Sequence, residues 1–254
     1  MRANPQGDFP ARTIKREPPA MRDDPKAFKG VPKKYQPHGM TILFEDRDII
    51  VVDKVSGLLT MSTESEREKT AYSLLTNYVR KGVHRSRNRI FIVHRLDRDT
   101  SGVLVFAKSE DAKRYLQDEW HDFKKTYYAV VRGALVEKEG VITSYLAENK
   151  AYKVFSVKGP EQGKFASTGY KVLRESQRFS LLEIDLHTGR KNQIRVHLAE
   201  KGHSVVGDEK YGIKEKGVNR LALHATAITL SHPHTHQLMT FEAPAPEYFR
   251  ILMK

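Results

Sequence analysis

Short β-rich segments follow one another through the second half of the chain, and this succession constrains the fold more than any other feature. The segments are rich in Val, Ile, Tyr, Phe and Thr, which favour strands, and turn residues separate them. Because parallel strands need a crossover of a dozen or more residues each time, such short connections predict antiparallel pairing. The expected strands of this half are residues 126–133, 140–146, 152–157, 166–173 and 178–187.

Three other segments have apolar residues at helical spacing. Residues 70–82 end in a basic turn, and Gly82 favours a helix stopped by glycine. Ser109 is suited to cap a second helix with an apolar stripe, and residues 192–202 predict a third helix that ends at Gly202. Single helices between runs of adjacent strands predict an α+β fold, with a central, mostly antiparallel sheet flanked by helices and loops.

The N-terminal segment, residues 1–39, differs in composition from the rest. It holds seven of the eleven prolines, and its basic residues outnumber its acidic ones. With few apolar residues to bury, it predicts a basic, Pro-rich arm that is poorly ordered. We therefore expect one ordered domain over residues 40–254, which begins with a hairpin of strands at 41–44 and 49–54.

Charge indicates the class of partner. The chain carries 44 Lys and Arg against 31 Asp and Glu, a formal net charge of +13. Such a charge attracts phosphate-bearing polymers at long range, so nucleic acid is the expected partner. The sequence has no long apolar span and a mean hydropathy of −0.57, so we expect a cytoplasmic protein without a membrane segment. The lack of cysteine excludes disulfides, thiol nucleophiles and cysteine-ligated zinc.

Polar residues crowd the stretch HRLDRDTSG, residues 94–102, directly behind the apolar residues FIV. A lone Asp in such a loop usually accepts backbone N–H bonds and shapes a turn. Here Asp97 lies between Arg95 and Arg98, and loops held by rigid strands are common places for chemistry. Asp97 is therefore a candidate catalytic carboxylate. We interpret residues 99–102 as shaping the loop and turning the chain into the next strand.

The same loop has a weaker likeness to the D-x-D-x-T nucleophile of magnesium-dependent phosphohydrolases. That pattern needs Thr four residues after the first Asp, whereas Thr100 lies three residues after Asp97. We find no downstream lysine and paired acidic residues that would hold the metal. The phosphohydrolase stays open as the less favoured alternative.

A second polar stretch, residues 186–212, combines a strand end, a helix and a loop. Taken alone, the basic residues at the start of its helix are equally consistent with a solvent-exposed face and with a functional role. The combination with the first stretch favours function. The polar residues concerned are Arg190, Lys191, Asn192, Arg195, His197, Asp208 and Tyr211.

Together, HRLDRDTSGVLVFAKS and TGRKNQIRVHLAEKGHSVVGDEKYG resemble the RluA-type pseudouridine synthases. The resemblance extends to residues 42–59, 124–133 and 220–249, and so covers nearly all of the chain after the arm. It implies a pseudouridine-synthase catalytic domain over residues 40–254. It also implies an enzyme that detaches uracil from ribose in RNA, rotates the ring and rejoins it through carbon 5, without metal or cofactor.

The resemblance assigns three residues to the chemistry. The family's motif aspartate falls on Asp97, the nucleophile, which attacks either the anomeric carbon of the sugar or the uracil ring. Its motif arginine falls on Arg195, whose charge would keep Asp97 ionised in a closed site. The tyrosine of its K-x-Y-x-A pattern falls on Tyr127. Because neighbouring residues of a strand point to opposite faces, Tyr128 can pack inside while Tyr127 meets uracil and takes part in proton transfer.

Two further residues are implied to hold the substrate. A stacked uridine must leave the RNA stack before it can react, and Arg95 matches the residue that enters the vacated space in the family. Ile194 would cover the face of the uracil ring opposite Tyr127.

Basic residues near the motifs are expected to grip RNA, with a mere solubility patch as the alternative. Where many members of the family have Thr-His, this chain has Lys191 and Asn192, which bears on substrate preference more than on chemistry. We see no room for the small RNA-binding domain that some relatives carry at the N-terminus, so we expect recognition within the catalytic domain. The expected contacts are Arg80, Lys81, Arg85, Arg87, Arg89, Arg190 and Lys191.

Other readings stay open beside this one. A catalytically inactive RNA-binding protein of the same fold is the second hypothesis, and the intact Asp97, Tyr127 and Arg195 argue against it. Ribosomal RNA and transfer RNA are both compatible with the sequence, and no obligatory protein partner is evident. The histidines of SHPHTHQ, residues 231–237, look like metal ligands, but the resemblance favours a turn at a strand end.

Overall fold

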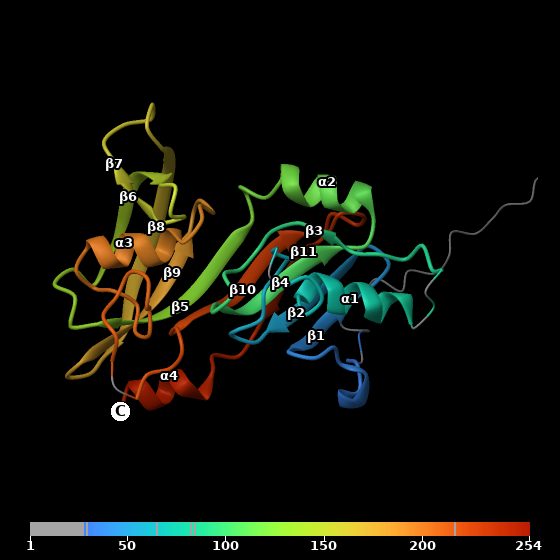
Figure 1. Cartoon of the computed structure of the whole chain (residues 1–254), viewed down its shortest axis with the longest axis horizontal. Helices are drawn as coiled ribbons and strands as arrows, with labels where there is room; N and C mark the ends of the chain where they lie inside the picture. Colours follow the sequence, from blue (N-terminus) through green and yellow to red (C-terminus); the bar gives the residue numbers. More distant parts are fainter. Residues whose placement is uncertain (1–27, 29, 65, 82, 84, 216) are drawn as a thin grey trace, which may run out of the picture.

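An eleven-stranded sheet runs through the length of the molecule (Figure 1). The computed structural model describes residues 28, 30–64, 66–81, 83, 85–215 and 217–254. Its strands are β1 (Met40–Glu45), β2 (Ile49–Lys54), β3 (Phe91–Ile92), β4 (Ser101–Ala107), β5 (Lys124–Arg132), β6 (Glu139–Glu148), β7 (Val154–Val157), β8 (Lys164–Glu175), β9 (Phe179–Leu186), β10 (Leu223–Ser231) and β11 (Leu238–Glu242).

The pairing of these strands follows the order β1-β2-β4-β10-β5-β9-β8-β6-β7, with β11 on β10 and β3 on β4. Every described pair is antiparallel except that of β4 with β10. Those two strands lie more than a hundred residues apart in the sequence, which leaves ample chain for a parallel crossover. The predicted α+β fold with a mostly antiparallel sheet is confirmed.

In the part of the chain that the structure describes, four α-helices flank the sheet. They are α1 (Ala71–Arg80), α2 (Glu110–Asp118), α3 (Gln193–Glu200) and α4 (Glu247–Leu252). Ser109 caps α2 as predicted, since its hydroxyl accepts a hydrogen bond from the N–H of Ala112 at 3.1 Å. The expected glycine stop of α1, Gly82, lies outside the described residues. The described end of that helix is Lys81, which has a left-handed backbone with φ of +50°.

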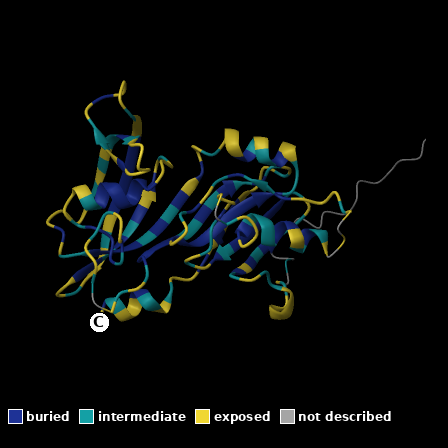
Figure 2. Cartoon of the chain, viewed as in Figure 1, coloured by how far each residue is buried: buried dark blue, intermediate teal, exposed yellow. Residues whose placement is uncertain are grey.

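The central strand β4 is buried on both faces, so its sequence is apolar throughout. Leu104 and Phe106 pack into the cluster beneath α1, whereas Val103 and Val105 pack against α2 and β11 on the other face. Figure 2 shows this buried centre in dark blue. A strand clamped between two apolar layers gives the loop that precedes it a rigid base.

Helix α3 lies over the other half of the sheet, against β6, β7 and β8 (Figure 1). Its residues from Gln193 to Leu198 are all buried, including Arg195 and His197. The polar ones bond to the sheet: the Nε2 of Gln193 donates to Thr168 Oγ1 at 2.8 Å, and His197 Nδ1 lies 2.9 Å from the same oxygen. The helix itself is therefore not a solvated face, although Arg190 and Lys191 before it are exposed.

Most of the expected N-terminal arm, residues 1–27 and 29, lies outside the described residues. The described part of it contacts the domain, because the ring of Phe28 lies 5.8 Å from that of Phe44 and the side-chain oxygen of Gln36 accepts from the N–H of Ile42 at 2.7 Å. Among the described helices, none has the length and apolar character needed to cross a membrane.

Candidate active site

A cleft of about 290 Å³ opens where the loop between β3 and β4 faces the start of α3. Its walls come from segments far apart in the sequence. Arg95 and Asp97 belong to the loop, Tyr127 comes from β5, Arg190 precedes α3, and Ile194 lies in the first turn of α3. Its volume is close to the lower end of the range usual for ligand pockets, so it suits one small ligand or one unit of a polymer.

Two buried polar side chains hold the loop on either side of Asp97. The hydroxyl of Thr60 donates to the carbonyl of Leu96 at 2.9 Å and accepts from its N–H at 3.2 Å. The fully buried Lys54 donates from Nζ to the carbonyl of Arg98 at 3.0 Å, and also to two carbonyls of its own segment. The backbone before and after Asp97 is thereby fixed.

The chain after Asp97 turns sharply into β4. The N–H of Thr100 donates to the carbonyl of Asp97 at 3.2 Å. Gly102 has φ of +111°, and a Cβ there would lie 2.1 Å from the carbonyl oxygen of Ala225 in the parallel partner β10. Only glycine allows this close approach, so the resulting bend sets the direction in which the loop leaves the sheet.

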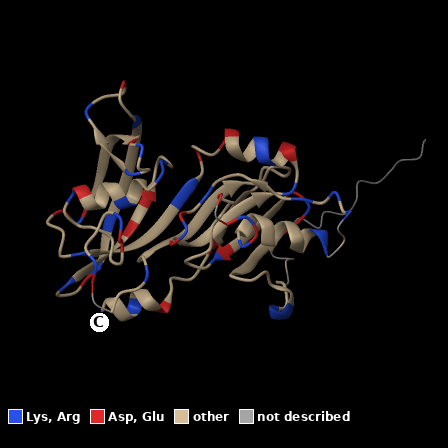
Figure 3. Ribbon diagram, in the orientation of Figure 1, with Lys and Arg blue, Asp and Glu red and all other residues tan. Residues whose placement is uncertain are grey.

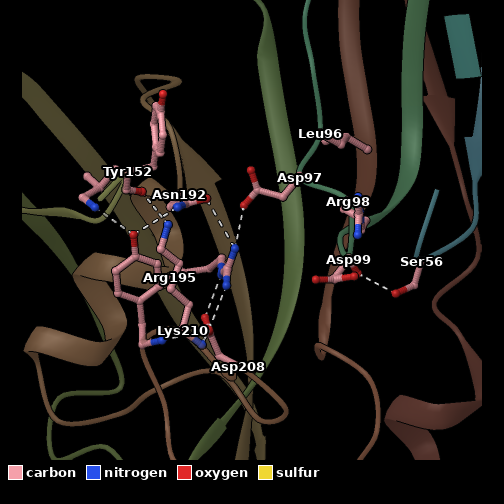
Figure 4. A network of polar contacts seen from close by, with 12 residues as sticks. Ser56, Leu96, Asp97, Arg98, Asp99, Tyr152, Asn192, Arg195, Asp208 and Lys210 are labelled. Atoms are coloured by element: carbon pink, nitrogen blue, oxygen red, sulfur yellow. Dashed lines mark hydrogen bonds and ion pairs between the residues drawn. The ribbon is translucent and has the colours of Figure 1, made fainter. Parts of the chain in front are cut away.

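Arg195 lies between two carboxylates (Figure 4). Its Nη1 donates to Asp97 Oδ2 at 3.1 Å. Its Nε and Nη2 donate to the two oxygens of Asp208 at 2.7 and 2.8 Å. The carboxylate of Asp208 is 0% exposed, so Arg195 is held by a buried partner while its remaining edge faces Asp97.

The charges of this cluster support one another. Burial raises the pKa of Asp208, but the hydrogen bonds and charge of Arg195, with the N–H groups of Tyr211 and Lys210, outweigh it and hold that pKa below its ordinary value. Burial likewise lowers the pKa of Arg195, while Asp208 and Asp97 raise it further than burial lowers it. Arg195 is therefore a permanent cation beside Asp97.

Tyr127 and its neighbour occupy opposite faces of β5, as strand alternation predicted. Tyr127 is buried and lines the cleft, whereas Tyr128 is half-buried and does not line it. Burial and the negative charge of Asp97 raise the pKa of Tyr127 well above its ordinary value. Its hydroxyl is therefore protonated at neutral pH and is a hydrogen-bond donor there.

The cleft is also lined by His94, Trp120 and Lys125. The rings of His94 and Trp120 stack with centroids 4.3 Å apart, and His94 Nε2 accepts from the N–H of Val105 at 3.0 Å. Burial and the charge of Lys125 lower the pKa of His94 to about 3. This histidine stays neutral near pH 7, so it holds the loop on β4 and is not a proton shuttle.

The structure brings six of the sequence-predicted site residues to the cleft: Asp97, Tyr127, Arg195, Arg95, Ile194 and Arg190. It does not bring Lys191, Arg85 or Arg87 there. Lys191 forms an ion pair with Glu148, and Arg85 and Arg87 are exposed on the segment after α1. More widely, Lys and Arg are interspersed with Asp and Glu along the ribbon (Figure 3).

Sequence reasoning gave no role to several residues of the site. The sequence indicates Asn192, Asp208 and Tyr211 only as members of a polar stretch, and Asn192 also as a departure from the family pattern. It gives no indication that the fully buried Lys54 or the ring of Trp120 belongs to the site. A signal for Asp208 existed, because a buried Arg on α3 needs a carboxylate partner nearby in the fold.

Within the part of the chain that the structure describes, one group of three acidic or histidine residues could hold a metal: Asp46, Asp48 and His232. Its groups already have partners. His232 Nε2 lies 2.7 Å from Asp46 Oδ2, and its Nδ1 accepts from the N–H groups of His234 and Thr235. The bonds to Nδ1 lie within the turn between β10 and β11, and the Nε2 contact joins that turn to the one between β1 and β2. The group contains none of the cleft residues.

The arrangement offers a carboxylate fixed by a permanent cation, beside a protonated phenol, in a cleft that one nucleotide can enter. Such a carboxylate is suited to act as a nucleophile, because Arg195 stabilises its negative charge through Oδ2 alone. The exposed Arg95 lies at the same cleft.

Comparison with known proteins gives the family context of this site. The family model for RNA pseudouridylate synthase matches residues 48–200, which include Asp97, Tyr127 and Arg195. Human RNA pseudouridylate synthase domain containing 4 has a similar solved structure, with a TM-score of 0.68, 22% identity, and coverage of 82% of this chain and 90% of that one.

Curated relatives agree with this match. An uncharacterized RNA pseudouridine synthase of Bacillus subtilis (strain 168) is 38% identical over 211 residues, 82% of this chain and 69% of that protein. The ribosomal large subunit pseudouridine synthase D of Nitrosomonas europaea is 35% identical, over 85% of this chain and 64% of that protein. The tRNA pseudouridine synthase C of Yersinia pestis is 33% identical, over 84% of this chain and 90% of that protein.

Proposed function

The chain belongs to the RNA pseudouridylate synthase family and is an RNA-modifying isomerase, and from this premise we propose that it converts specific uridines of structured ribosomal or transfer RNA to pseudouridine with Asp97 as the nucleophile. The observation that carries the proposal is the 3.1 Å contact between Asp97 and Arg195 at the cleft. The curated relatives from N. europaea and Y. pestis are named for ribosomal and transfer RNA, which supports both classes as candidates.

The proposed reaction exchanges one glycosidic bond for another. The N1–C1′ bond of uridine breaks, the ring turns, and a C5–C1′ bond forms, after which the proton of C5 leaves and N1 gains a proton. Asp97 attacks either C1′ or the uracil ring, and in both cases it is released unchanged when the new bond is complete. The reaction needs no oxidant, metal or cofactor to balance.

Arg195 places a positive charge beside the nucleophile, in a site from which the RNA would exclude water. A closed cleft penalises a free carboxylate, and a guanidinium in contact with it offsets that penalty. Asp208 fixes the guanidinium through two hydrogen bonds, so Arg195 stays in place when the substrate enters. Asp208 thereby acts on the chemistry through Arg195.

The uracil ring would lie between Tyr127 and Ile194, which both line the cleft. Stacking of a base on an aromatic side chain contributes about 1–3 kcal/mol, which helps to hold a nucleotide outside its stack. The protonated hydroxyl of Tyr127 can donate to a uracil oxygen. To accept the C5 proton it would first have to pass its own proton on, because its pKa is raised.

We propose that the target uridine is flipped out of the RNA and that Arg95 fills the space it leaves. Arg95 supports this role because it is exposed, lies two residues before Asp97 and lines the same cleft. Flipping costs a few kcal/mol, and an inserted guanidinium that stacks in the helix offsets part of this cost.

We assign binding of the rest of the RNA to four exposed basic residues, Arg190, Lys191, Arg85 and Arg87. Their number would make RNA binding strongly dependent on salt concentration.

We assign catalysis to residues 40–254 and treat residues 1–39 as an arm outside the catalytic domain. We further propose that the enzyme acts in the cytoplasm without an obligatory protein partner.

The experiment that tests the proposed function is a map of pseudouridines in cells with and without this protein. Pseudouridine that has reacted with a carbodiimide stops primer extension, so each modified position gives a band. The proposal predicts that at least one stop in ribosomal or transfer RNA is missing from cells without the protein and returns with the wild-type gene. Identical maps in the two cell lines would contradict it.

A further inference from the structure

Asn192 lies beside the carboxylate of Asp97 in a backbone conformation that few residues adopt. Its φ is +53° and its ψ is +16°, the left-handed region that Asn tolerates better than most side chains. It occupies the N-cap position of α3, where an Asn side chain normally bonds the first free N–H groups of a helix. Here the side chain makes no such bond. It is turned toward the cleft and is only 9% exposed.

The amide of Asn192 bridges Asp97 and Tyr211. With its two polar atoms placed so that both are satisfied, Nδ2 donates to Asp97 Oδ2 at 2.8 Å and to Oδ1 at 3.2 Å. Oδ1 of the amide accepts from the hydroxyl of Tyr211 at 3.0 Å. In the reverse orientation, which Figure 4 draws, the amide oxygen accepts from Arg195 Nη1 at 3.3 Å and Nδ2 donates to the Tyr211 hydroxyl at 3.0 Å, but the amide oxygen then also lies against the carboxylate of Asp97, where neither group can donate. Figure 4 shows Asn192 next to Arg195 and Asp97.

Tyr211 determines which way this amide points. Its hydroxyl oxygen accepts from the backbone N–H of Val154 in β7 at 3.0 Å, and a backbone N–H can only donate. The single proton of the hydroxyl is then free for the amide oxygen of Asn192. At the other end of this series of hydrogen bonds, the carboxylate of Asp97 can only accept. Each group therefore donates to the next, from Val154 through Tyr211 and Asn192 to Asp97.

Two different groups thus hold the same carboxylate. Arg195 bonds only to Oδ2 of Asp97, whereas Asn192 reaches both of its oxygens. A single contact through one oxygen leaves a carboxylate free to rotate about its Cβ–Cγ bond. A second donor that spans both oxygens fixes the plane of the group. The oxygen with fewer and longer contacts, Oδ1, keeps the freer lone pairs.

We propose that Asn192, oriented by Tyr211, is a positioning residue for the isomerisation, which fixes the plane of the Asp97 carboxylate and leaves Oδ1 as the attacking oxygen. This inference rests on the proposed function of Asp97. It gives a catalytic use to a position at which the sequence departs from the family pattern, and it does so through an uncharged donor whose hydrogen bonds do not depend on pH.

The test measures turnover with a probe that needs no knowledge of the target site. Total RNA is labelled with [5-³H]uridine in cells that lack the protein, and the purified full-length protein is added. Because isomerisation removes the hydrogen of C5, each turnover releases tritium to water. Tritium release by the wild-type protein tests the proposed function separately from the variants.

Three variants separate positioning from folding. Asn192→Gly keeps the left-handed backbone and removes the amide, and it should lower kcat about 10- to 100-fold with KM changed less than about threefold. Tyr211→Phe keeps the ring next to Arg195 and removes the hydroxyl, and it should lower kcat by a smaller factor. In the double variant the effect of Tyr211→Phe should disappear, since Tyr211 acts through Asn192.

Asn192→Asp gives a signature that a purely structural role would not give. It preserves the shape of the side chain but sets a second carboxylate against Asp97. At pH 8 its activity should fall below that of Asn192→Gly. As the pH is lowered its activity relative to wild type should rise, because one proton shared by the two carboxylates restores a donor. Melting temperatures of all variants measure the contribution of folding.

The outcomes distinguish the inference from its premise. If the wild-type protein releases no tritium, the proposed function fails and the inference fails with it. If the wild type is active and folded Asn192→Gly matches its kcat, only the inference is wrong. Additive effects of Asn192→Gly and Tyr211→Phe, or an Asn192→Asp variant without recovery at low pH, would also overturn it.

Discussion

Asp208 holds Arg195 through both of its oxygens, with Nε–Oδ2 and Nη2–Oδ1 distances of 2.7 and 2.8 Å. This bidentate pair is buried, and it leaves a single edge of the guanidinium for Asp97. A long, flexible side chain is thereby converted into a fixed cation at the cleft. The geometry explains why arginine rather than lysine suits this position, since an ammonium could not bind Asp208 through two parallel bonds and still face Asp97.

Replacement of Asp208 by Asn should weaken both stability and turnover. In the variant, Arg195 loses the negative charge of its buried partner and one of the two oxygens that accept its hydrogen bonds. Breaking a buried ion pair costs about 3 kcal/mol of unfolding free energy. Because Arg195 becomes mobile, kcat should fall as well. Chemical denaturation and tritium release from labelled RNA measure the two effects. Glu137→Gln, which breaks the exposed pair with Lys201, is the matched control and should change neither.

The same variant also tests how the stability contributed by the ion pair of Asp208 and Arg195 depends on pH. Since the pKa of Asp208 is lower in the folded than in the unfolded chain, the ion pair stabilises fully above the ordinary pKa of 3.8 and is lost as the pH falls through the lower, folded value. The wild-type protein should therefore lose its stability advantage over Asp208→Asn below about pH 4. A constant difference between the two proteins down to pH 2 would contradict this assignment.

Tyr127→Phe should abolish most turnover while RNA binding is retained. The ring remains and can still stack on uracil, but the protonated hydroxyl that lines the cleft is lost, and proton-transfer groups contribute about 10²- to 10⁴-fold in rate. Tyr128→Phe is the matched control, because Tyr128 lies on the opposite face of β5 and does not line the cleft. Equal activity of the two variants in the tritium assay would show that the hydroxyl of Tyr127 has no special role.

Lys54→Met should destabilise the protein and lower its activity although Lys54 does not touch the cleft. The substitution leaves three backbone carbonyls without their donor, including that of Arg98 in the loop between β3 and β4, and should cost about 2–4 kcal/mol of unfolding free energy. Burial lowers the pKa of Lys54, the charges of Asp99 and Asp97 offset part of that effect, and the resulting pKa is about 7.

Stability as a function of pH gives a second measurement on Lys54. The unfolded chain holds the lysine proton up to about pH 10, whereas the folded chain releases it near pH 7. The unfolding free energy of the wild type should therefore rise relative to Lys54→Met as the pH increases from 7 to about 10. Lys150→Met, at an exposed position, should behave as wild type at every pH. A Lys54→Met protein as stable as this control would show that the loop does not depend on Lys54.

Arg95→Ala should lower turnover more on folded RNA than on RNA unfolded by heating and rapid cooling. If Arg95 fills the space of a flipped uridine, its loss matters only where the uridine must leave a stack. Arg98→Ala changes an exposed arginine of the same loop that does not line the cleft, and it should have a smaller effect on both RNAs. Equal losses for Arg95→Ala on folded and unfolded RNA would argue against insertion and for phosphate binding.

Much of the fold could be predicted from the sequence because its determinants are local. The alternation of side chains along β5 separates Tyr127 from Tyr128, and Ser109 caps α2 within four residues of the chain. The parallel pairing of β4 with β10 could not be predicted in this way, since it depends on contacts between residues more than a hundred positions apart.

The residues of the candidate site also fall into those that the sequence predicts and those that it does not. Asp97 and Arg195 were expected together only because family motifs connect residues 98 positions apart. Tyr211 has no distinguishing mark in the sequence. A buried Arg195 calls for a carboxylate partner, but the sequence cannot single out Asp208, because a carboxylate that binds an arginine and one that shapes a loop look alike there. Asn192 was interpreted as bearing on substrate preference, and its unusual backbone, which turns the amide toward Asp97, is visible only in three dimensions.

The most direct test of the account is tritium release from [5-³H]uridine-labelled RNA by purified Asp97→Asn. Asn keeps the size of the side chain and removes the charge that makes it a nucleophile. We expect no release above background, together with RNA binding in a filter assay close to that of the wild type. Continued release of tritium by the purified variant would show that Asp97 is not the nucleophile.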